Sequence, residues 1–204
     1  MLNLIPALSP VALNPGETLC YVASWEGRHA VLPVLQRLGA DMNAADKFGR
    51  TPVYVACWNN QKETLRVLYG LGADIDRPHM NGRTPCAVAA WKGHLEILRT
   101  LNQLGADLNK GNFYNVTPCC VAARGNGSTV IKTLHELGAD VNLGTKTGNT
   151  PVMLAASKGH VESVRTLHAL GADIEKANNK VTIPSRTHLS PSITLPSLTT
   201  LSVN

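Results

Sequence analysis

The tripeptide Gly-Ala-Asp occurs five times in this chain of 204 residues, and the copies are evenly spaced. They begin at Gly39, Gly72, Gly105, Gly138 and Gly171. A second marker, Thr-Pro, keeps the same spacing at residues 51–52, 84–85, 117–118 and 150–151, and Thr18-Leu19 stands at the same phase. Two markers in register without insertions predict a repeat protein, in which each unit buries its apolar side against its neighbours.

Helix signals recur at fixed places in each unit. The Thr of each Thr-Pro pair suits a helix N-cap, and the Pro suits the first helical position, where no amide donor is needed. Gly or Asn occupies three further columns, where a left-handed residue would end the first helix, end the second helix and form a turn. These columns are residues 27, 60, 93, 126 and 159; residues 39, 72, 105, 138 and 171; and residues 16, 49, 82, 115 and 148.

Aliphatic residues form three more columns in the second helix of each unit. Their spacing of three residues places them on one stripe, which we expect to be buried against the neighbouring unit. The columns are Leu35, Leu68, Leu101, Leu134 and Leu167; Leu38, Leu71, Leu104, Leu137 and Leu170; and Leu32, Leu65, Leu98, Ile131 and Val164.

A 33-residue period with the segments TPVYVA, TPCAVA, TPCCVA and TPVMLA, each followed by Gly-Ala-Asp, resembles the ankyrin repeat. The resemblance covers residues 13–177 as five repeats: 13–45, 46–78, 79–111, 112–144 and 145–177. It implies an all-α repeat solenoid of stacked helix-turn-helix units with β-hairpin fingers. One departure is regular, because the family's His two residues after the Pro is replaced by Tyr21, Tyr54, Ala87, Cys120 and Met153. Packing must therefore hold that position.

The two ends of the chain depart from the pattern. Residues 1–12 read as an N-terminal extension, and residues 178–204 as the start of a degenerate sixth repeat followed by a tail. Val181 and Ile183 stand where the turn Gly and the cap Thr would be, and ten Ser or Thr and three Pro lie between Thr182 and Asn204. This composition predicts a disordered tail. Whether the chain is a fragment or a truncated product stays open.

Composition excludes several classes of protein. No run of about 18 apolar residues occurs, so we expect no membrane insertion. The five cysteines are odd in number and contain no Cys-x-x-Cys pair, which favours an intracellular protein. We expect a cytoplasmic location, and a nuclear location stays open. The apolar start of the chain lacks a basic region and contains Pro6 and Pro10, so it does not read as a signal peptide.

The sequence contains no motif typical of an enzyme. Walker A, His-Glu-x-x-His, Gly-x-Ser-x-Gly and Gly-x-Gly-x-x-Gly patterns are absent. The Asp of each Gly-Ala-Asp recurs in every unit, which indicates a turn rather than acid–base chemistry. Cys20, Cys86 and Cys119 share one column and read as small buried hydrophobes. We therefore predict a non-enzymatic protein without catalytic residues, metal or cofactor.

The nine aromatic residues gather in particular columns. Trp25, Trp58 and Trp91 share one column, which continues as Arg124. In ankyrin-like repeats the concave surface is lined by the first helices and the fingers, and partners usually bind there. By this resemblance, eight of the nine aromatic residues fall on that surface, because only Tyr69 lies on a second helix.

The same columns carry more bases than acids, and the acids Glu17, Glu26 and Asp46 all lie in the first third of the chain. Trp, Tyr and Arg dominate binding hot spots, so the sequence predicts a scaffold that binds a partner protein through an acidic or apolar segment. The predicted binding residues are Tyr21, Trp25, Phe48, Arg50, Tyr54, Trp58, Arg83, Trp91, Lys92, Phe113, Tyr114 and Arg124.

Three alternatives stay open. The aromatic rings could pack against one another and stiffen the solenoid instead of binding a partner. The same face could bind nucleic acid or a nucleotide by stacking bases, although the net charge of +5 is modest for that role. The chain could also be the targeting part of a larger enzyme. The identity of the partner and the oligomeric state are not determined by the sequence.

Overall fold

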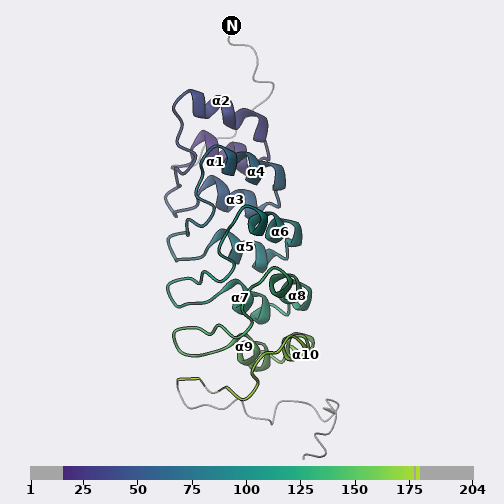
Figure 1. Cartoon of the computed structure of the whole chain (residues 1–204). Helices are drawn as coiled ribbons and strands as arrows, with labels where there is room; N and C mark the ends of the chain where they lie inside the picture. The colour runs from purple at the N-terminus through teal and green to yellow at the C-terminus, as the bar shows by residue number, and fades with distance from the viewer. Residues whose placement is uncertain (1–15, 177, 180–204) are drawn as a thin grey trace, which may run out of the picture.

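A computed structural model describes residues 16–176 and 178–179, which form a stack of five helix pairs (Figure 1). The first helices of the pairs are α1 (Leu19–Trp25), α3 (Pro52–Trp58), α5 (Pro85–Lys92), α7 (Pro118–Arg124) and α9 (Pro151–Ser157). The second helices are α2 (Leu32–Arg37), α4 (Lys62–Gly70), α6 (Leu95–Gln103), α8 (Ser128–Glu136) and α10 (Val161–Ala169). A short 3-10 helix, η1 (His29–Val31), precedes α2. The expected N-terminal extension, and the expected tail from residue 180 onward, lie outside the described residues.

Each first helix begins as the Thr and Pro columns predict. The Thr51 hydroxyl accepts a hydrogen bond of 3.1 Å from the Tyr54 amide, and Pro52 is the first helical residue. The same cap occurs at Thr18, Thr84, Thr117 and Thr150. Because the hydroxyl satisfies one amide that has no partner within the helix, the cap fixes where the helix starts in every unit.

All fifteen positions of the Gly and Asn columns have a left-handed backbone, with φ between 55° and 93°. Asn takes this conformation at Asn60, Asn115 and Asn126. The three turns of the unit are therefore set by local backbone preference, as predicted.

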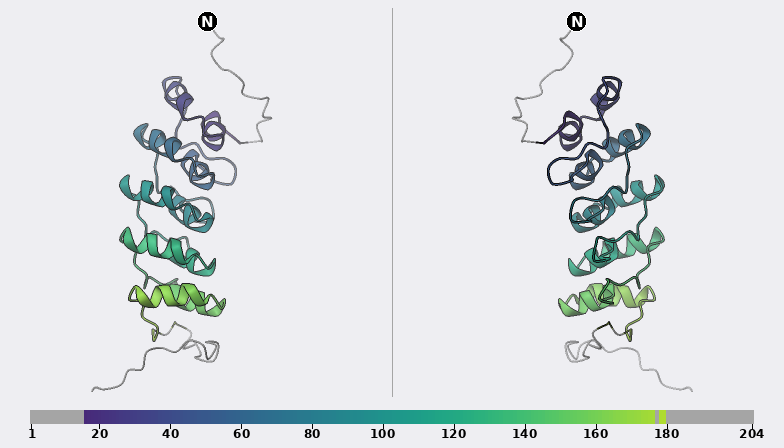
Figure 2. Two further views of the ribbon diagram at one scale, coloured as in Figure 1. Left: turned by 90° about the vertical axis from the view of Figure 1, so that its right-hand side faces the viewer. Right: turned by 90° about the vertical axis from the view of Figure 1, so that its left-hand side faces the viewer.

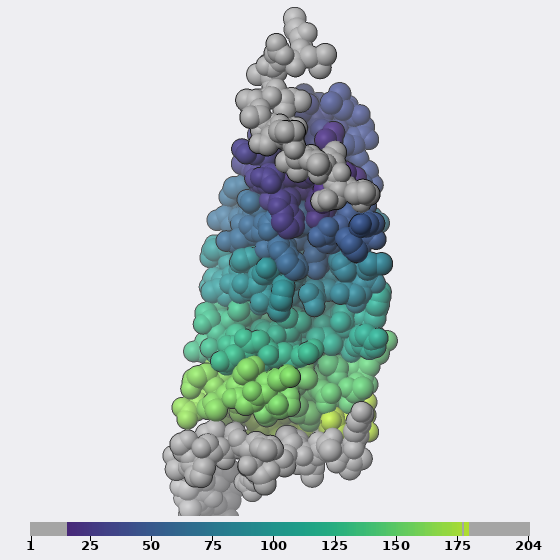
Figure 3. Space-filling model, turned by 180° about the vertical axis from the view of Figure 1, so that it is seen from behind, coloured from purple at the N-terminus to yellow at the C-terminus, as the bar shows by residue number. Residues whose placement is uncertain are grey.

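The stack has two layers of helices (Figure 2). The first helices contact one another in sequence order, and consecutive second helices do the same. Figure 3 shows the units from behind as successive bands across the stack. Leu68, Leu101, Leu134 and Leu167 are fully buried, which confirms four of the five residues in this apolar column, and Leu35 in the first unit is partly buried.

The apolar prediction is wrong at Leu38, whose side chain is 79% exposed. The equivalent residues Leu71, Leu104, Leu137 and Leu170 are partly buried and pack against the core. Leu38 lies in the first unit, and the described residues contain no helix pair before α1. The column is therefore covered only where an earlier unit is present.

The fingers between units differ from the implied β-hairpins, because the described residues contain no strands. Each finger is a turn closed by two backbone hydrogen bonds, such as Asp46 N to Arg50 O (3.0 Å) and Gly49 N to Asp46 O (2.9 Å). Single bonds link some neighbouring fingers, for example Lys146 N to Tyr114 O at 2.9 Å. Two bonds per finger are too few for a strand ladder.

Within the described ranges, no helix is both long enough and apolar enough to span a lipid bilayer.

Candidate functional site

The first helices lie between the fingers and the second helices (Figure 1). We call the surface formed by the ends of the first helices and by the fingers the first-helix face. It comprises residues 25, 58, 91, 124 and 157 together with the fingers 46–50, 79–83, 112–116 and 145–149. Because the units repeat with a constant period, equivalent side chains lie at the same place in successive layers.

The three Trp residues on this face differ in exposure. Trp25 is 39% exposed and Trp91 is 51% exposed, whereas Trp58 is partly buried against the core. The rings of Trp58 and Trp91 are in contact, with centroids 5.3 Å apart and planes tilted by 54°. Lys92 Nζ lies 4.2 Å from the Trp58 centroid and 5.0 Å from the Trp91 centroid. The cluster of Trp58, Trp91 and Lys92 therefore packs two units together and is also partly exposed to solvent.

The backbone around these rings is held by the next unit. His94 Nε2 lies 3.1 Å from the Trp58 carbonyl oxygen, and His160 Nε2 lies 3.0 Å from the Arg124 carbonyl oxygen. The side-chain amide of Asn59 donates from Nδ2 to the Trp25 carbonyl oxygen at 3.2 Å. These bonds satisfy carbonyls at helix ends and fix the positions of the side chains that project from them.

Tyr21 and Tyr54 are largely buried, because each residue is only 3% exposed, and of the two only Tyr54 lines a pocket on this face. Their rings lie 6.3 Å from those of Trp25 and Trp58, respectively, so they support these rings from within. Burial raises the pKa of Tyr21 to about 12, against the opposing charge of Arg50, and burial also raises the pKa of Tyr54. The signal was present in the sequence, since both residues occupy the column that packing was expected to hold.

Arg50 is engaged within its own finger. Its guanidinium contacts the buried Asp46 carboxylate at 2.6 Å, and the amides of Phe48 and Arg50 donate to Asp46 Oδ1 at 2.9 and 2.8 Å. Burial alone would raise the pKa of Asp46, but the hydrogen bonds from Arg50 and the two amides outweigh it and lower that pKa. The guanidinium also lies 5.2 Å from the rings of Tyr21 and Phe48. Arg50 is thus a neutralised support for Phe48 rather than a free cation.

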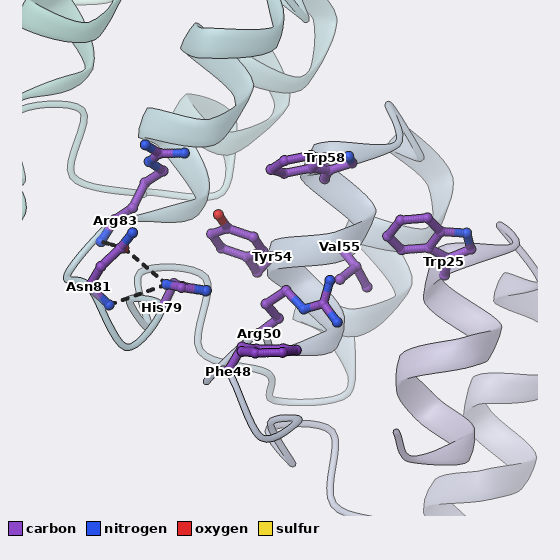
Figure 4. A pocket seen from close by; sticks show the side chains of 9 residues that line it. All are labelled: Trp25, Phe48, Arg50, Tyr54, Val55, Trp58, His79, Asn81 and Arg83. Carbon is purple, nitrogen blue, oxygen red and sulfur yellow. Dashed lines mark hydrogen bonds between the residues drawn. The ribbon is translucent and has the colours of Figure 1, made fainter. Parts of the chain in front are cut away.

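A pocket of about 270 Å³, which we call the aromatic pocket, lies between the first two fingers and the ends of α1 and α3 (Figure 4). His79 and Asn81 were not among the predicted residues, yet both line it, and the His79 ring lies 5.3 Å from the Tyr54 ring. Asn81 Oδ1 holds the finger by accepting from the Arg83 amide at 3.0 Å. The lining residues are Trp25, Phe48, Arg50, Tyr54, Val55, Trp58, His79, Asn81 and Arg83.

A second pocket, of about 280 Å³, adjoins it on the next units, and we call it the basic pocket. Arg83 lines both pockets, and its guanidinium lies 5.5 Å from the Trp91 ring. The lining contains three cations and no Asp or Glu, so its charge is positive. The lining residues are Arg83, Ala87, Trp91, Asn112, Val116, Val121, Arg124, Gly125 and Lys158.

The remaining predicted residues lie outside these two pockets. Phe113 and Tyr114 are 59% and 71% exposed at the tip of their finger, and neither lines a pocket. Lys92 lies over the Trp58 and Trp91 rings without lining either pocket. The structure therefore brings the predicted Trp and Arg residues together, and it leaves the third finger as a separate exposed aromatic site.

The described part of the chain offers little for covalent or metal chemistry. All five cysteines are buried, and burial raises the pKa of the Cys119 thiol to about 12 and also raises those of the other four. A thiol held in its protonated form is a poor nucleophile. No group of three or more His, Cys, Asp or Glu suited to a metal ion occurs within residues 16–176 and 178–179.

Comparison with known families agrees with this architecture. In a scan of protein-family models, the family described as ankyrin repeats (3 copies) matches residues 19–112 and 108–178. A search among curated proteins returned no match to the chain. The two family matches together cover all five helix pairs, from α1 to α10. The chain therefore belongs to the ankyrin repeat family.

Proposed function

We propose that this protein is a non-enzymatic interaction scaffold whose first-helix face binds an extended segment of a partner protein. Ankyrin repeats generally mediate protein–protein interaction, which supports the general class. The observation that carries the specific proposal is the pair of adjoining pockets that share Arg83, one aromatic and one basic.

The aromatic pocket suits a bulky apolar side chain of the partner. Its walls include Trp25, Phe48 and Trp58, and the buried Tyr54 forms part of its lining. Rings that neighbouring residues already hold in place lose little conformational freedom when a ligand binds, so contact with them adds to affinity at low entropic cost. A large apolar residue of the partner is therefore expected to anchor here.

The basic pocket suits a carboxylate. Arg83, Arg124 and Lys158 surround it with no acidic side chain in the lining, and Trp91 provides an apolar wall. A partner carboxylate would meet positive charge that no acidic side chain in the lining offsets. This charge favours association with the partner and fixes how the partner segment is aligned along the stack. The proposed partner segment therefore carries a bulky apolar residue and, next along the stack, one or more acidic residues.

In this proposal the folded unit spans residues 13–177 and acts inside the cell. The five buried cysteines are all free thiols, which is the state expected in a reducing compartment.

The test begins with selection of peptides from a displayed random library on the full chain, followed by measurement of Kd for the enriched peptides by fluorescence anisotropy. We expect enriched peptides to pair an apolar with an acidic residue. Trp91→Ala combined with Arg124→Ala should weaken binding by at least about tenfold, because truncation of hot-spot residues commonly costs about 2 kcal/mol or more.

The matched control removes two Arg residues from the second helices. Arg66→Ala combined with Arg165→Ala breaks two exposed ion pairs, with Glu63 and Glu162, and should leave Kd unchanged. If the Trp91→Ala and Arg124→Ala double variant bound the peptides with the same Kd as the wild type, the proposal would be contradicted. The proposal would also be contradicted if single-stranded oligonucleotides bound more tightly than any selected peptide and if their affinity fell steeply as salt was added.

A further inference from the structure

The basic pocket holds more positive charge than a single carboxylate can neutralise. Arg83, Arg124 and Lys158 line it, and none of the other lining residues is Asp or Glu. A carboxylate brings one negative charge, whereas a phosphate monoester brings about −1.5 to −2 charges at pH 7 together with three acceptor oxygens. A phosphorylated side chain therefore matches the charge of this pocket better than Asp or Glu does.

The three cations of the basic pocket make no ion pair with another described residue. Within residues 16–176 and 178–179, the ion pairs are formed by Arg50, Arg66, Arg99 and Arg165. Arg124 and Lys158 are exposed. An incoming anion can therefore contact them without first displacing an acidic side chain from the described part of the chain.

The repeat explains why Arg83 differs from Arg50. In the first finger, Arg50 is paired with the buried Asp46 at 2.6 Å. Arg83 stands one period later, and His79 takes the place of Asp46 in that finger (Figure 4). The Arg83 guanidinium lies 5.5 Å from the Trp91 ring instead. The second finger therefore keeps the cation and lacks the acid that neutralises it in the first.

The acids of the first unit are absent from two positions in the later units. The position of Asp46 is occupied in the next three fingers by His79, Asn112 and Thr145. The position of Glu26 is occupied in the later units by Asn59, Lys92, Gly125 and Lys158. Positive charge is therefore concentrated on the last three units of the first-helix face, where the basic pocket lies, and it attracts an anion to that place.

The size of the basic pocket suits one anionic group. Its volume is about 280 Å³, whereas pockets for cofactors and drug-sized molecules usually measure about 300–1,000 Å³. Nucleic acids bind through several phosphates along the backbone, and here three cations converge on one small pocket. The exposed Trp91 ring gives the pocket an apolar wall for the carbon atoms that carry the phosphate.

The two pockets also set the spacing of the partner's anchoring residues. They adjoin one another and share Arg83, which places them about one layer of the stack apart. Neighbouring helices pack about 8–10 Å apart, and an extended chain advances about 3.3 Å per residue. A partner segment that fills both pockets therefore has about three residues between its apolar anchor and its anion.

We propose that the basic pocket binds a phosphoserine or phosphothreonine of the partner, about three residues from the apolar residue that fills the aromatic pocket. The proposal rests on the proposed function, and it adds that binding depends on phosphorylation of the partner. Arg83, Arg124 and Lys158 together donate to the phosphate oxygens, and such charge-assisted hydrogen bonds are among the stronger ones in proteins.

Three peptide libraries test the proposal on the full chain. Each has a fixed central residue, which is Ser, Glu or phosphoserine, and random residues on both sides. The Kd of the tightest phosphoserine peptide is then compared by fluorescence anisotropy with those of its Ser and Glu versions. Phosphoserine should bind at least about tenfold more tightly than Ser and about fivefold more tightly than Glu, because it adds charge-assisted hydrogen bonds.

Two double variants locate the phosphate. Arg124→Gln combined with Lys158→Gln should reduce the preference for phosphoserine over Ser to less than about twofold, because both cations line the basic pocket. The matched control is Lys132→Gln combined with Arg165→Gln, which removes two exposed cations from the second helices of the same two units. It should leave the preference as it is in the wild type.

Several results would overturn the phosphate proposal. Equal Kd values for the phosphoserine and Glu peptides would overturn it and leave the proposed function standing, whereas no binding by any library would overturn both. An unchanged preference in the Arg124 and Lys158 double variant, or an equal loss in the control, would show that the phosphate does not occupy the basic pocket. A single-stranded oligonucleotide that displaces the phosphoserine peptide more effectively than the unlabelled peptide does would assign the pocket to nucleic acid.

Discussion

Asp46 is the one buried acidic side chain among the described residues, and the finger around it depends on that charge. Its oxygens accept from the amides of Phe48 and Arg50 and from the Arg50 guanidinium. Asn112, at the equivalent place in a later unit, accepts the same two amides through a neutral amide oxygen. The backbone bonds therefore do not need a charge, whereas the ion pair does.

This comparison gives a prediction for Asp46→Asn. The free energy of unfolding at pH 7 should fall by about 2 kcal/mol, because a charge-assisted bond to a buried group is lost. Since the folded pKa of Asp46 is lowered, its contribution is present above the unfolded pKa and is lost as the pH falls through the folded value. Urea unfolding at pH 7 and at about pH 3 should show a smaller acid-induced loss in Asp46→Asn than in the wild type.

Asp140→Asn, in an exposed turn, is the control for general effects of removing one acid. An acid-induced loss in Asp46→Asn as large as that of the wild type would show that the pair with Arg50 has no role in stability.

Trp58 and Trp91 should separate the packing and binding roles of the aromatic column. Trp58→Ala should lower the free energy of unfolding by about 2 kcal/mol, because it removes a partly buried ring from the contact between units. Trp91→Ala should lower it by less than about 1 kcal/mol, because half of that side chain is already in water. Equal losses in chemical denaturation would mean that both rings serve the solenoid alone.

At the scale of elements, the turns and caps of each unit are predictable from the sequence because they depend on single residues. Thr51 and Pro52 fix the start of α3, and Asn60 adopts the left-handed turn that ends it. The burial of Tyr54 is harder to predict, since it depends on the neighbouring unit. The described fingers contain no strands because each finger makes only two backbone hydrogen bonds of its own. The residue pattern does not specify how many such hydrogen bonds form.

Two glycines with similar backbones should respond differently to substitution. Gly82 has φ of 81° and Gly105 has φ of 86°, so Ala is strained at both. A Cβ on Gly82 would lie 2.6 Å from the Phe113 amide nitrogen, whereas nothing lies within 4 Å of one on Gly105. We expect Gly105→Ala to lower the free energy of unfolding by about 1 kcal/mol. Gly82→Ala should lower it further, because two neighbouring fingers must separate, and a smaller loss than at Gly105 would contradict the fingers' close contact.

At the scale of the whole molecule, the repeat explains both what the sequence predicts and what it misses. The constant register of the units predicts the stack of helix pairs, because each unit repeats the same local signals. It does not predict that Leu38 is exposed, since burial in a stack depends on the unit before. The two pockets likewise depend on side chains from adjacent units, such as Arg83 and Lys158 in the basic pocket.

The most direct test of the proposed binding surface is a hydrogen-exchange footprint of the full chain with its tightest selected peptide. We predict slower exchange at the ends of α3, α5 and α7 and in the fingers 46–50, 79–83 and 112–116, with no change in α4, α6 and α8. Protection confined to the second helices would contradict the account, because the partner would then bind the opposite side of the stack.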